Sequence, residues 1–551
     1  MNDFRPKPAL VPRAQYTFPA PGYTAHAVVP GDLHTIYNFN PLYTAGITGA
    51  GQSIVVLEDS NVYNPGDWKT FRSKFGLATQ FPLGSFRQVH PKPSNASGNG
   101  GPCADPGLSA NGDEIESIID AEWASAAAPN AEVVLASCAS TNTSFGAFIA
   151  LQNLLTGPSP RPGIVSLSYE MPETISQASP PYQAYVTQLY QLAVLQGVSI
   201  FVGAGDSGGA AADLGAATAE SGVTVNGYAS TPYNVAVGGT DFGDLYLGES
   251  AQYWNAKNGK YLNSALSYIP EIPLNDSCAS RLLANYLGYS TPYGTDGLCN
   301  ASAFEEYLNT SAGGGGPSGC ATGTPSTYGA DEAAVSGDYA VVSGTCKGYA
   351  KPLFQISTPG NPNDGVRDLP DVSLFAADGT WGHYYIFCDS DPSDAPYGAP
   401  CTGAPSTWTG GGGTSFAAPV MAGIQALVNQ TAGSHQGNPN YILYALSARE
   451  YGFSRAAVCD ASLGGQVDSA CIFQDVTLGD NDVPCQLLEV NGVSIGAFNC
   501  YKPGGTYGVL SRSNRSYKPA WPATPGWDFA TGLGSVNAYN LVKAWPGSKV
   551  P

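Results

Sequence analysis

Short apolar segments that alternate with helical segments constrain the fold of this 551-residue chain more than any other feature of its sequence. The apolar segments lie at 53–58, 131–137, 163–168, 198–205 and 234–239, and the helical segments lie at 113–127, 145–155 and 182–196. Strands that are apolar throughout are buried on both faces, which is typical of parallel sheets flanked by helices. The alternation therefore predicts an α/β fold with a mainly parallel central sheet and helices on both faces.

The predicted domain organisation is one large domain over residues 30–551, preceded by an arm. Residues 1–29 are rich in proline and lack periodicity, which predicts an extended conformation. From about 241 to 349 the alternation gives way to Gly, Ser, Asn and Tyr with four cysteines, which predicts a long insertion pinned by disulfides. Regular segments return at 370–376, 383–387 and about 415–430.

The charge composition excludes some classes of partner. Only 12% of residues are charged, and acidic residues outnumber basic ones 43 to 23, which disfavours nucleic acids and anionic membranes. No stretch approaches about 18 apolar residues, and the first residues contain no signal-peptide core. Acid denatures proteins by protonating carboxylates that are paired in the folded state, so a protein with few such pairs loses little stability at low pH. This composition fits adaptation to acid, and it equally fits an ordinary Gly- and Ser-rich secreted protein.

The cysteines indicate an oxidising compartment. Their number is even, no CxxC motif occurs, and they fall into near-neighbour pairs: Cys103/Cys138, Cys278/Cys299, Cys320/Cys346, Cys388/Cys401, Cys459/Cys471 and Cys485/Cys500. Disulfides in a secreted protein are favoured over a zinc or redox site, although the spacing leaves the connectivity open. Candidate glycosylation acceptors, which also arise by chance, are Asn95, Asn142, Asn275, Asn300, Asn309 and Asn514.

The segment GGGGTSFAAPVMAGIQALVNQ, residues 410–430, predicts a nucleophile at Ser415. The glycines allow close backbone approach, Ser415 begins a helix, and Pro419 is expected in the first turn. The helix dipole and free N–H groups there favour negative charge next to the serine, as acyl transfer requires. The alternative is a glycine loop followed by an N-capped buried helix.

The base that would activate this serine is predicted to be a carboxyl group. The chain has five histidines, none in a His-Gly-Thr context, and His34 and His383 are expected to be packing or surface residues. Glu116 and Asp120, four residues apart on the predicted helix 113–127, share one helix face. Such proximity raises the pKa of one member, which can then act as an acid–base group at low pH. The alternative is a solvated acidic helix face.

Several motifs together resemble the sedolisin family of serine-carboxyl peptidases, which have a subtilisin-like fold. Gly413-Thr414-Ser415-x-x-x-Pro419 fits the family's nucleophile signature, and Pro129 follows Asp120 at the family's spacing of nine residues. Further matches are the Gly-Asp-Ser-Gly in 201–208 and the segments 42–52, 237–240 and 367–373, so that the resemblance covers roughly 33–534. The chain departs from the family at Ser168-Tyr169-Glu170, where Ser-Trp-Gly is usual, which leaves the pocket shape and cleavage preference open.

The resemblance implies roles for particular residues. Ser415 would be the nucleophile, Glu116 the base, Asp120 its partner, and a protonated Asp206 the donor to the oxyanion. Without the family context, Gly-Asp-Ser-Gly is a weak motif that also fits a turn.

The resemblance also implies one structural calcium ion in the C-terminal region, about 473–534. Its ligands would be the carboxylates of Asp475 and Asp528 and the backbone carbonyls of Val476, Thr524 and Gly526. Such a set of oxygen ligands suits calcium. The alternative is two turns with solvated aspartates.

The predicted function is that of a secreted, acid-active serine-carboxyl endopeptidase that hydrolyses peptide bonds in protein or peptide substrates. The resemblance implies a propeptide that precedes the mature enzyme and is removed, and we expect a monomer. Two alternatives are a tripeptidyl exopeptidase of the same family and an inactive subtilisin-like binding protein.

Overall fold

The computed structural model describes residues 26–550 with gaps. The residues outside the description are 1–25, 94–100, 109–112, 159, 174–179, 323–324, 328–340, 345, 357, 393–400, 402, 404, 406–407, 409, 453–455, 488, 491–492, 495–498, 512–515, 519 and 551. Most of the predicted N-terminal arm and the acceptors Asn95 and Asn514 therefore lie outside the described residues.

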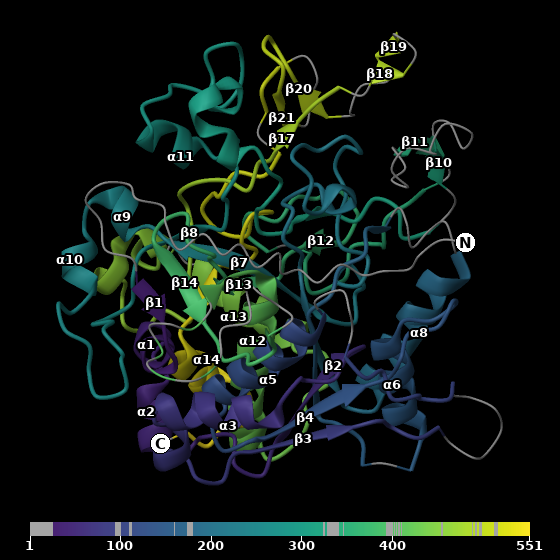
Figure 1. Ribbon diagram of the computed structural model, residues 1–551, viewed down its shortest axis with the longest axis vertical. Coiled ribbons are helices and arrows are strands. Elements are labelled where there is room, and N and C mark those ends of the chain that lie inside the picture. The colour runs from purple at the N-terminus through teal and green to yellow at the C-terminus, as the bar shows by residue number, and fades with distance from the viewer. Residues whose placement is uncertain are drawn as a thin grey trace.

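An eight-stranded sheet forms the centre of the molecule (Figure 1). Its order is β13 (Val372–Phe375), β7 (Val235–Phe242), β6 (Ser199–Gly203), β5 (Ile164–Leu167), β2 (Ser53–Glu58), β4 (Glu132–Ser137) and β3 (Ser85–Val89), with β8 (Glu271–Pro273) paired to β7. All these strands run parallel to their neighbours except β8, which is antiparallel to β7. The prediction of an α/β fold with a mainly parallel sheet is confirmed.

Helices cover both faces of the sheet, because alternate residues of its strands enter two different cores. Ile54 and Val56 of β2 belong to the core that contains α5 (Asp113–Ala127) and α12 (Thr414–Ala432). Val55 and Leu57 belong to the core that contains α6 (Gly146–Thr156) and α8 (Pro180–Leu195). The four helices predicted from the sequence are therefore the ones that enclose the central sheet.

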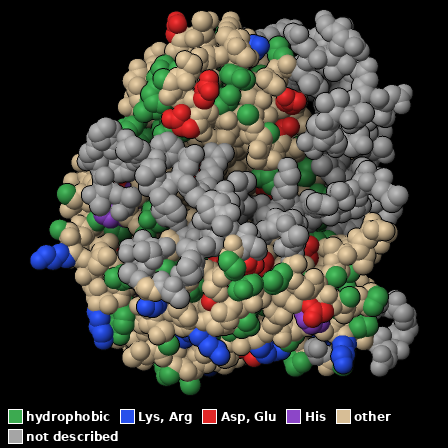
Figure 2. Space-filling model, viewed as in Figure 1, with side chains coloured by type: hydrophobic (Ala, Val, Ile, Leu, Met, Phe, Trp, Pro, Cys, Tyr) green, Lys and Arg blue, Asp and Glu red, His purple; other side chains and the backbone are tan. Residues whose placement is uncertain are grey.

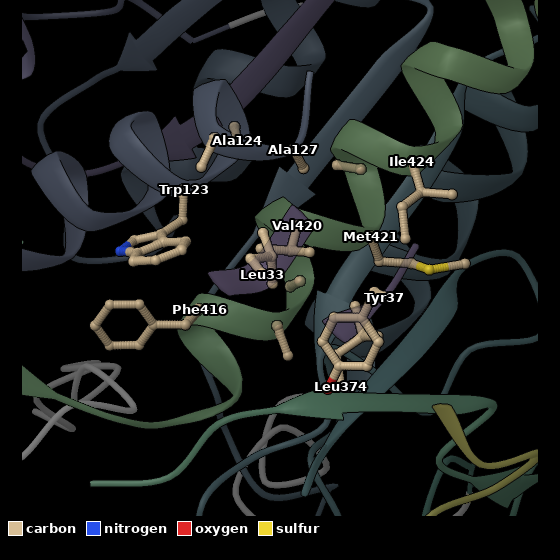
Figure 3. Close-up of a cluster of buried hydrophobic side chains, with 14 of the residues drawn as sticks. Leu33, Tyr37, Trp123, Ala124, Ala127, Leu374, Phe416, Val420, Met421 and Ile424 are labelled. Carbon is tan, nitrogen blue, oxygen red and sulfur yellow. The ribbon is translucent and has the colours of Figure 1, made fainter. Parts of the chain in front are cut away.

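The packing of α5 against α12 fixes the positions of the two helices that carry the predicted catalytic residues. The indole of Trp123 on α5 faces Phe416 on α12 (Figure 3), and Phe416 stacks on Tyr385 with ring centroids 4.6 Å apart. The helices approach closely at Gly423, where a β-carbon would lie 2.5 Å from that of Ala127. A larger residue there would overpack the interface and separate the helices.

The remaining elements surround this core. The other helices are α1 (Pro30–Ile36), α2 (Asn40–Thr44), α3 (Pro65–Lys74), α4 (Leu77–Gln80), α9 (Asp244–Leu247), α10 (Ser250–Tyr253), α11 (Arg281–Tyr286), α13 (Asn440–Tyr451) and α14 (Ala538–Ala544). The short strands are β1 (His26–Val28), β9 (Gly316–Pro317), β10 (Pro325–Thr327), β11 (Val341–Gly344), β12 (Asp368–Leu369), β14 (His383–Ile386), β15 (Gly410–Gly411), β16 (Phe473–Gln474), β17 (Pro484–Cys485), β18 (Glu489–Val490), β19 (Val493–Ser494), β20 (Cys500–Tyr501), β21 (Gly508–Leu510) and β22 (Ser535–Val536).

Two regions predicted to be irregular contain short elements. The last residues of the predicted arm form β1, which pairs in parallel with β14, so the arm ends in a strand. The predicted insertion contains α9, α10, α11 and β8, and α11 lies at the top of the view in Figure 1 near β17, β20 and β21. There, Leu282 and Leu283 pack in one cluster with Trp381 and Val509.

Six disulfides join the near-neighbour cysteines, each closing a loop of 12 to 35 residues. The connectivity that the spacing left open is therefore the sequential one. Among the candidate glycosylation acceptors, Asn142 is exposed, whereas Asn275 and Asn309 are buried and donate hydrogen bonds to protein carbonyls. No described helix is both long enough and apolar enough to cross a membrane.

Candidate active site

Ser415 is the second residue of α12, where a run of glycines brings the chain close to the end of β13. A β-carbon at Gly412 would lie within about 2.4 Å of the backbone of Ala376 and Ala377, so only glycine fits there. Gly413 has φ of 122°, a conformation that favours glycine. The serine is fully buried, and its hydroxyl lies 3.4 Å from the backbone oxygen of Ser168.

Pro419 lies in the second turn of α12, not in the first as the sequence analysis predicted, because the helix already begins at Thr414. A proline here has no N–H to donate to the carbonyl four residues earlier, which is that of Ser415. The hydroxyl of Ser168 lies 3.4 Å from this carbonyl oxygen. The proline therefore frees a backbone acceptor beside the nucleophile, and the Ser168 hydroxyl lies next to it.

Glu116 and Asp120 lie on the buried face of α5. Both side chains are fully buried, as is every residue of this helix, so the alternative of a solvated acidic face is wrong. The hydroxyl of Ser168, which follows β5, donates to both carboxylate oxygens of Asp120 at 2.8 and 2.9 Å. Ser168 thereby connects the partner carboxyl of α5 with the backbone of the nucleophile.

Burial raises the pKa of both carboxyl groups. For Glu116, burial and the charge of Asp120 raise the pKa well above its usual value, while the Ser415 hydroxyl lowers it. Neither oxygen of Glu116 has a hydrogen bond of standard geometry within the described residues, but the Ser415 hydroxyl is close enough to stabilise its charged form. Burial raises the pKa of Asp120 to about 8 against hydrogen bonds from Ser168 and Glu58. The pair can hold a proton in acid and exchange it with the serine.

Asp206 lies beyond the end of β6, where Gly205 has φ of 110° and turns the chain toward α12. One oxygen of Asp206 accepts the backbone N–H of Thr414 at 2.7 Å, and the other is buried without a hydrogen-bond partner among the described residues. Burial raises the pKa of this carboxyl to about 7. The group is therefore neutral in acid, and its second oxygen can donate a hydrogen bond beside Ser415.

Two further carboxyl groups of this site, those of Glu58 and Glu170, were not predicted from the sequence. Glu58, the last residue of β2, is buried and accepts the Tyr169 hydroxyl at 2.6 Å. Glu170 accepts the backbone N–H of Asp206 at 3.0 Å, so the residue that departs from the family pattern contacts the oxyanion candidate. Their position in the sequence was the signal that could have indicated them: Glu58 ends β2 and Glu170 follows β5. Ligands of parallel sheets bind at the carboxyl ends of the strands.

The histidines do not provide an alternative base. The ring of His34 is buried and lies 2.8 Å from the backbone oxygen of Ala126. His383 forms buried ion pairs with Asp241 and Asp244 at 3.3 and 3.1 Å. The groups near the Ser415 hydroxyl are the Ser168 carbonyl and Glu116, and no described histidine forms a hydrogen bond with it.

Four of the five predicted calcium ligands, Asp475, Thr524, Gly526 and Asp528, lie together at two turns. The backbone N–H of Gly526 donates to one oxygen of Asp475 at 2.8 Å, and that of Thr524 donates to Asp528 at the same distance. Burial and the charge of Asp528 raise the pKa of Asp475 to about 8, and its second oxygen is buried with no hydrogen-bond partner among the described residues. A cation bound by this oxygen of Asp475 would offset the repulsion between the two buried carboxylates, so the residues present suit a cation site. Two other groups of candidate ligands each contain cysteines that are disulfide-bonded.

Comparison with known proteins agrees with this geometry. No family model matches the chain. Kumamolisin from Bacillus sp. (strain MN-32) is 24% identical over an alignment 551 positions long, which covers 98% of this chain and 68% of that protein. The solved structure of Pseudomonas sedolisin, a serine-carboxyl proteinase complexed with two molecules of pseudo-iodotyrostatin, is 19% identical with a TM-score of 0.56, and the match covers 95% of this chain and 98% of that one. The resemblance to the sedolisin family predicted from the motifs is thereby confirmed: the chain is similar in sequence to kumamolisin, and it has the subtilisin-like fold of Pseudomonas sedolisin.

Proposed function

We propose that this protein is an acid-active serine-carboxyl endopeptidase that cleaves peptide bonds in proteins through an acyl-enzyme. The observation that carries the proposal is the meeting of α12 and α5, where buried Ser415 lies beside buried Glu116 and is connected to Asp120 through Ser168. A solvated acidic helix or a surface binding protein would not require these groups to converge in one buried site.

In the proposed reaction, the Ser415 hydroxyl oxygen attacks the carbonyl carbon of the substrate and its proton passes to Glu116. Asp206, in its protonated form, donates a hydrogen bond to the oxyanion of the tetrahedral intermediate. Glu116 then returns the proton to the leaving amine. Water hydrolyses the acyl-enzyme by the same steps in reverse, while Asp120 orients Glu116 and adjusts its pKa.

The charge states that this mechanism requires predict activity in acid. Asp206 must keep its proton, and burial raises its pKa to about 7, so activity should fall as the pH rises through that value. Glu116 must be partly ionised while Asp120 holds a proton, which limits activity at very low pH.

The first experiment is a pH profile of the hydrolysis of a denatured protein, with Ser415→Ala as the comparison. We expect an optimum at roughly pH 3–5 that disappears in the variant. An optimum near neutrality would point to a different base, and a folded protein without activity would favour a binding function. Peptides with blocked N-termini distinguish the two kinds of peptidase, because an endopeptidase cleaves them and a tripeptidyl peptidase does not.

We also propose one structural calcium ion at Asp475 and Asp528, with the carbonyls of Val476, Thr524 and Gly526 as further ligands. The ion would neutralise the two buried carboxylates and join their turns.

The six disulfides support secretion into an oxidising compartment. Residues 30–551 are proposed to form one catalytic domain with an insertion at about 241–349.

A further inference from the structure

The direction of the Asp206 carboxyl decides whether it can stabilise an oxyanion, because a donor is effective only if it already points at the developing charge. The carboxyl, carbonyl and N–H groups of this residue are each held by a different segment. Thr414 donates its N–H to one carboxylate oxygen at 2.7 Å, and Ala312 donates its N–H to the backbone carbonyl at 2.9 Å. The N–H of Asp206 donates to the side chain of Glu170 at 3.0 Å.

Glu170 reaches Asp206 from the neighbouring strand. β5 and β6 pair in parallel, so their carboxyl ends lie at the same edge of the sheet. Glu170 follows Leu167, which ends β5, by the same short distance in sequence as Asp206 follows Gly203, which ends β6. The contact therefore comes from the order of the strands and not from the sequence around Asp206.

The backbone of Glu170 is fixed by Asn226, which is fully buried. The amide of Asn226 donates to the carbonyl of Tyr169 at 3.1 Å and accepts the N–H of Met171 at 3.2 Å. It also donates to the carbonyl of Gly203 at 2.9 Å. The chain on both sides of Glu170 is thus tied directly to the end of β6.

The side chain of Glu170 fills the space beside Gly205. Only 3% of Glu170 is exposed, and a β-carbon on Gly205 would lie 2.1 Å from the carboxylate oxygen that accepts the Asp206 N–H. Gly205 itself has φ of 110°, a conformation that favours glycine. The carboxylate and the turn therefore fit together closely, which restricts the peptide group between Gly205 and Asp206.

We propose that Glu170 is a positioning residue for the oxyanion donor: it fixes the peptide N–H of Asp206 and thereby directs the Asp206 carboxyl toward the tetrahedral intermediate. Glu170 stands where the motif comparison expects glycine, which has no side chain to accept this N–H. The inference rests on the proposed function, because it adds a residue to the same reaction.

Binding of peptide aldehydes tests this role separately from substrate recognition. The Ser415 hydroxyl adds across the aldehyde carbonyl, with its oxygen bonding to carbon, and forms a hemiacetal that retains all atoms and places an oxygen where the oxyanion would lie. The corresponding peptide alcohol cannot form this adduct. Across a panel of such pairs, the preference for the aldehyde should fall about tenfold in Glu170→Ala, while the Kd of the alcohol changes by less than about twofold.

The conservative variant distinguishes the hydrogen bond from the charge of the side chain. In Glu170→Gln the amide oxygen can accept the same N–H, so most of the aldehyde preference should be recovered. Glu170→Gly, which places the residue usual in the family at this position, provides the same test as Glu170→Ala if the alanine variant does not fold.

Cleavage kinetics provide the second measurement. For peptides that the wild type cleaves, Glu170→Ala should lower kcat about tenfold and leave KM within about twofold, because the lost contact acts in the transition state. Asp67 is the matched control, since it is also 3% exposed and accepts a backbone N–H, that of Ser390, at 3.0 Å. Asp67→Ala should lower the Tm without changing kcat or the aldehyde preference.

The outcomes separate this inference from the proposed function. A wild type that prefers the aldehyde, with the same preference in Glu170→Ala, overturns the positioning role and leaves the peptidase intact. Equal losses of affinity for the aldehyde and the alcohol also overturn it, because Glu170 would then act in substrate binding. A wild type that cleaves no peptide and binds both compounds equally contradicts the proposed function, and the positioning role falls with it.

Discussion

At the scale of single residues, the site is a set of buried carboxyl groups that differ in their hydrogen bonds. Ser168 donates to Asp120, Tyr169 donates to Glu58, and Thr414 donates to Asp206. Burial raises the pKa of all three carboxyl groups, and the hydrogen bond that each group accepts lowers its pKa in part. The same residue type can therefore act as base, partner or proton donor within one site.

Glu58 provides the prediction at this scale. Burial raises its pKa well above the usual value, so Glu58 is protonated in acid and its hydrogen bond lowers the pKa of Asp120. Glu58→Leu should therefore raise the pKa of Asp120, and it should also leave this buried carboxyl without one of the hydrogen bonds that hold it against Glu116, so we expect kcat to fall by roughly tenfold. The measurement is the pH profile of kcat, in which the limb that reports the carboxyl pair should move to higher pH.

The control is Glu58→Gln, which keeps a neutral donor of the same shape. Its amide can donate to Asp120 and its oxygen can accept from Tyr169, so activity should stay within about threefold of the wild type. If Glu58→Gln loses as much activity as Glu58→Leu, Glu58 acts as a proton carrier and not as a positioning residue.

At the scale of elements, the sequence predicts the helices and strands better than the contacts between them. Apolar periodicity places α5 over its full observed length and β2 to the residue. The convergence of Glu58 and Glu170 on the site could not be predicted, because it depends on which strands become neighbours in the sheet. The strand β1 was missed for the same reason, since its stability comes from pairing with β14, more than 350 residues later.

Calcium removal tests the junction between the two C-terminal turns. A ligand present at about 100 times its Kd stabilises the folded state by ~2.7 kcal/mol, so chelation should lower the Tm by several degrees. Calcium should restore the Tm, and the variants Asp475→Asn and Asp528→Asn should no longer respond to chelator. Asp468→Asn, an exposed aspartate of the same region, should respond like the wild type. A Tm that is independent of chelator in the wild type would exclude a structural ion.

At the scale of the whole molecule, buried carboxyl groups set the pH dependence of stability. Figure 2 shows acidic side chains both in the upper part and across the middle of one face, and basic side chains mainly along its lower edge. Exposed ion pairs contribute little to stability. Inside the protein, burial raises the pKa of Asp32 to about 6, of Asp206 to about 7 and of Asp482 to about 8. These groups bind protons more tightly in the folded state than in the unfolded state.

The free energy of unfolding should therefore be greatest in acid and fall as the pH rises from about 4 to 8, since the folded state binds more protons throughout that interval. Each unit by which folding raises a pKa corresponds to about 1.4 kcal/mol. At very low pH, stability is limited by groups such as Asp244. Burial opposes ionisation of Asp244, but the charge of His383 lowers its pKa to about 2. Its contribution to the free energy of unfolding is therefore lost as the pH falls below about 4. Urea unfolding of Ser415→Ala, which avoids self-cleavage, measures this dependence at constant calcium concentration. A free energy of unfolding that increases from pH 4 to pH 8 would show that these carboxyls are ionised in the folded protein, and the same result would remove the physical basis proposed here for an enzyme that works in acid.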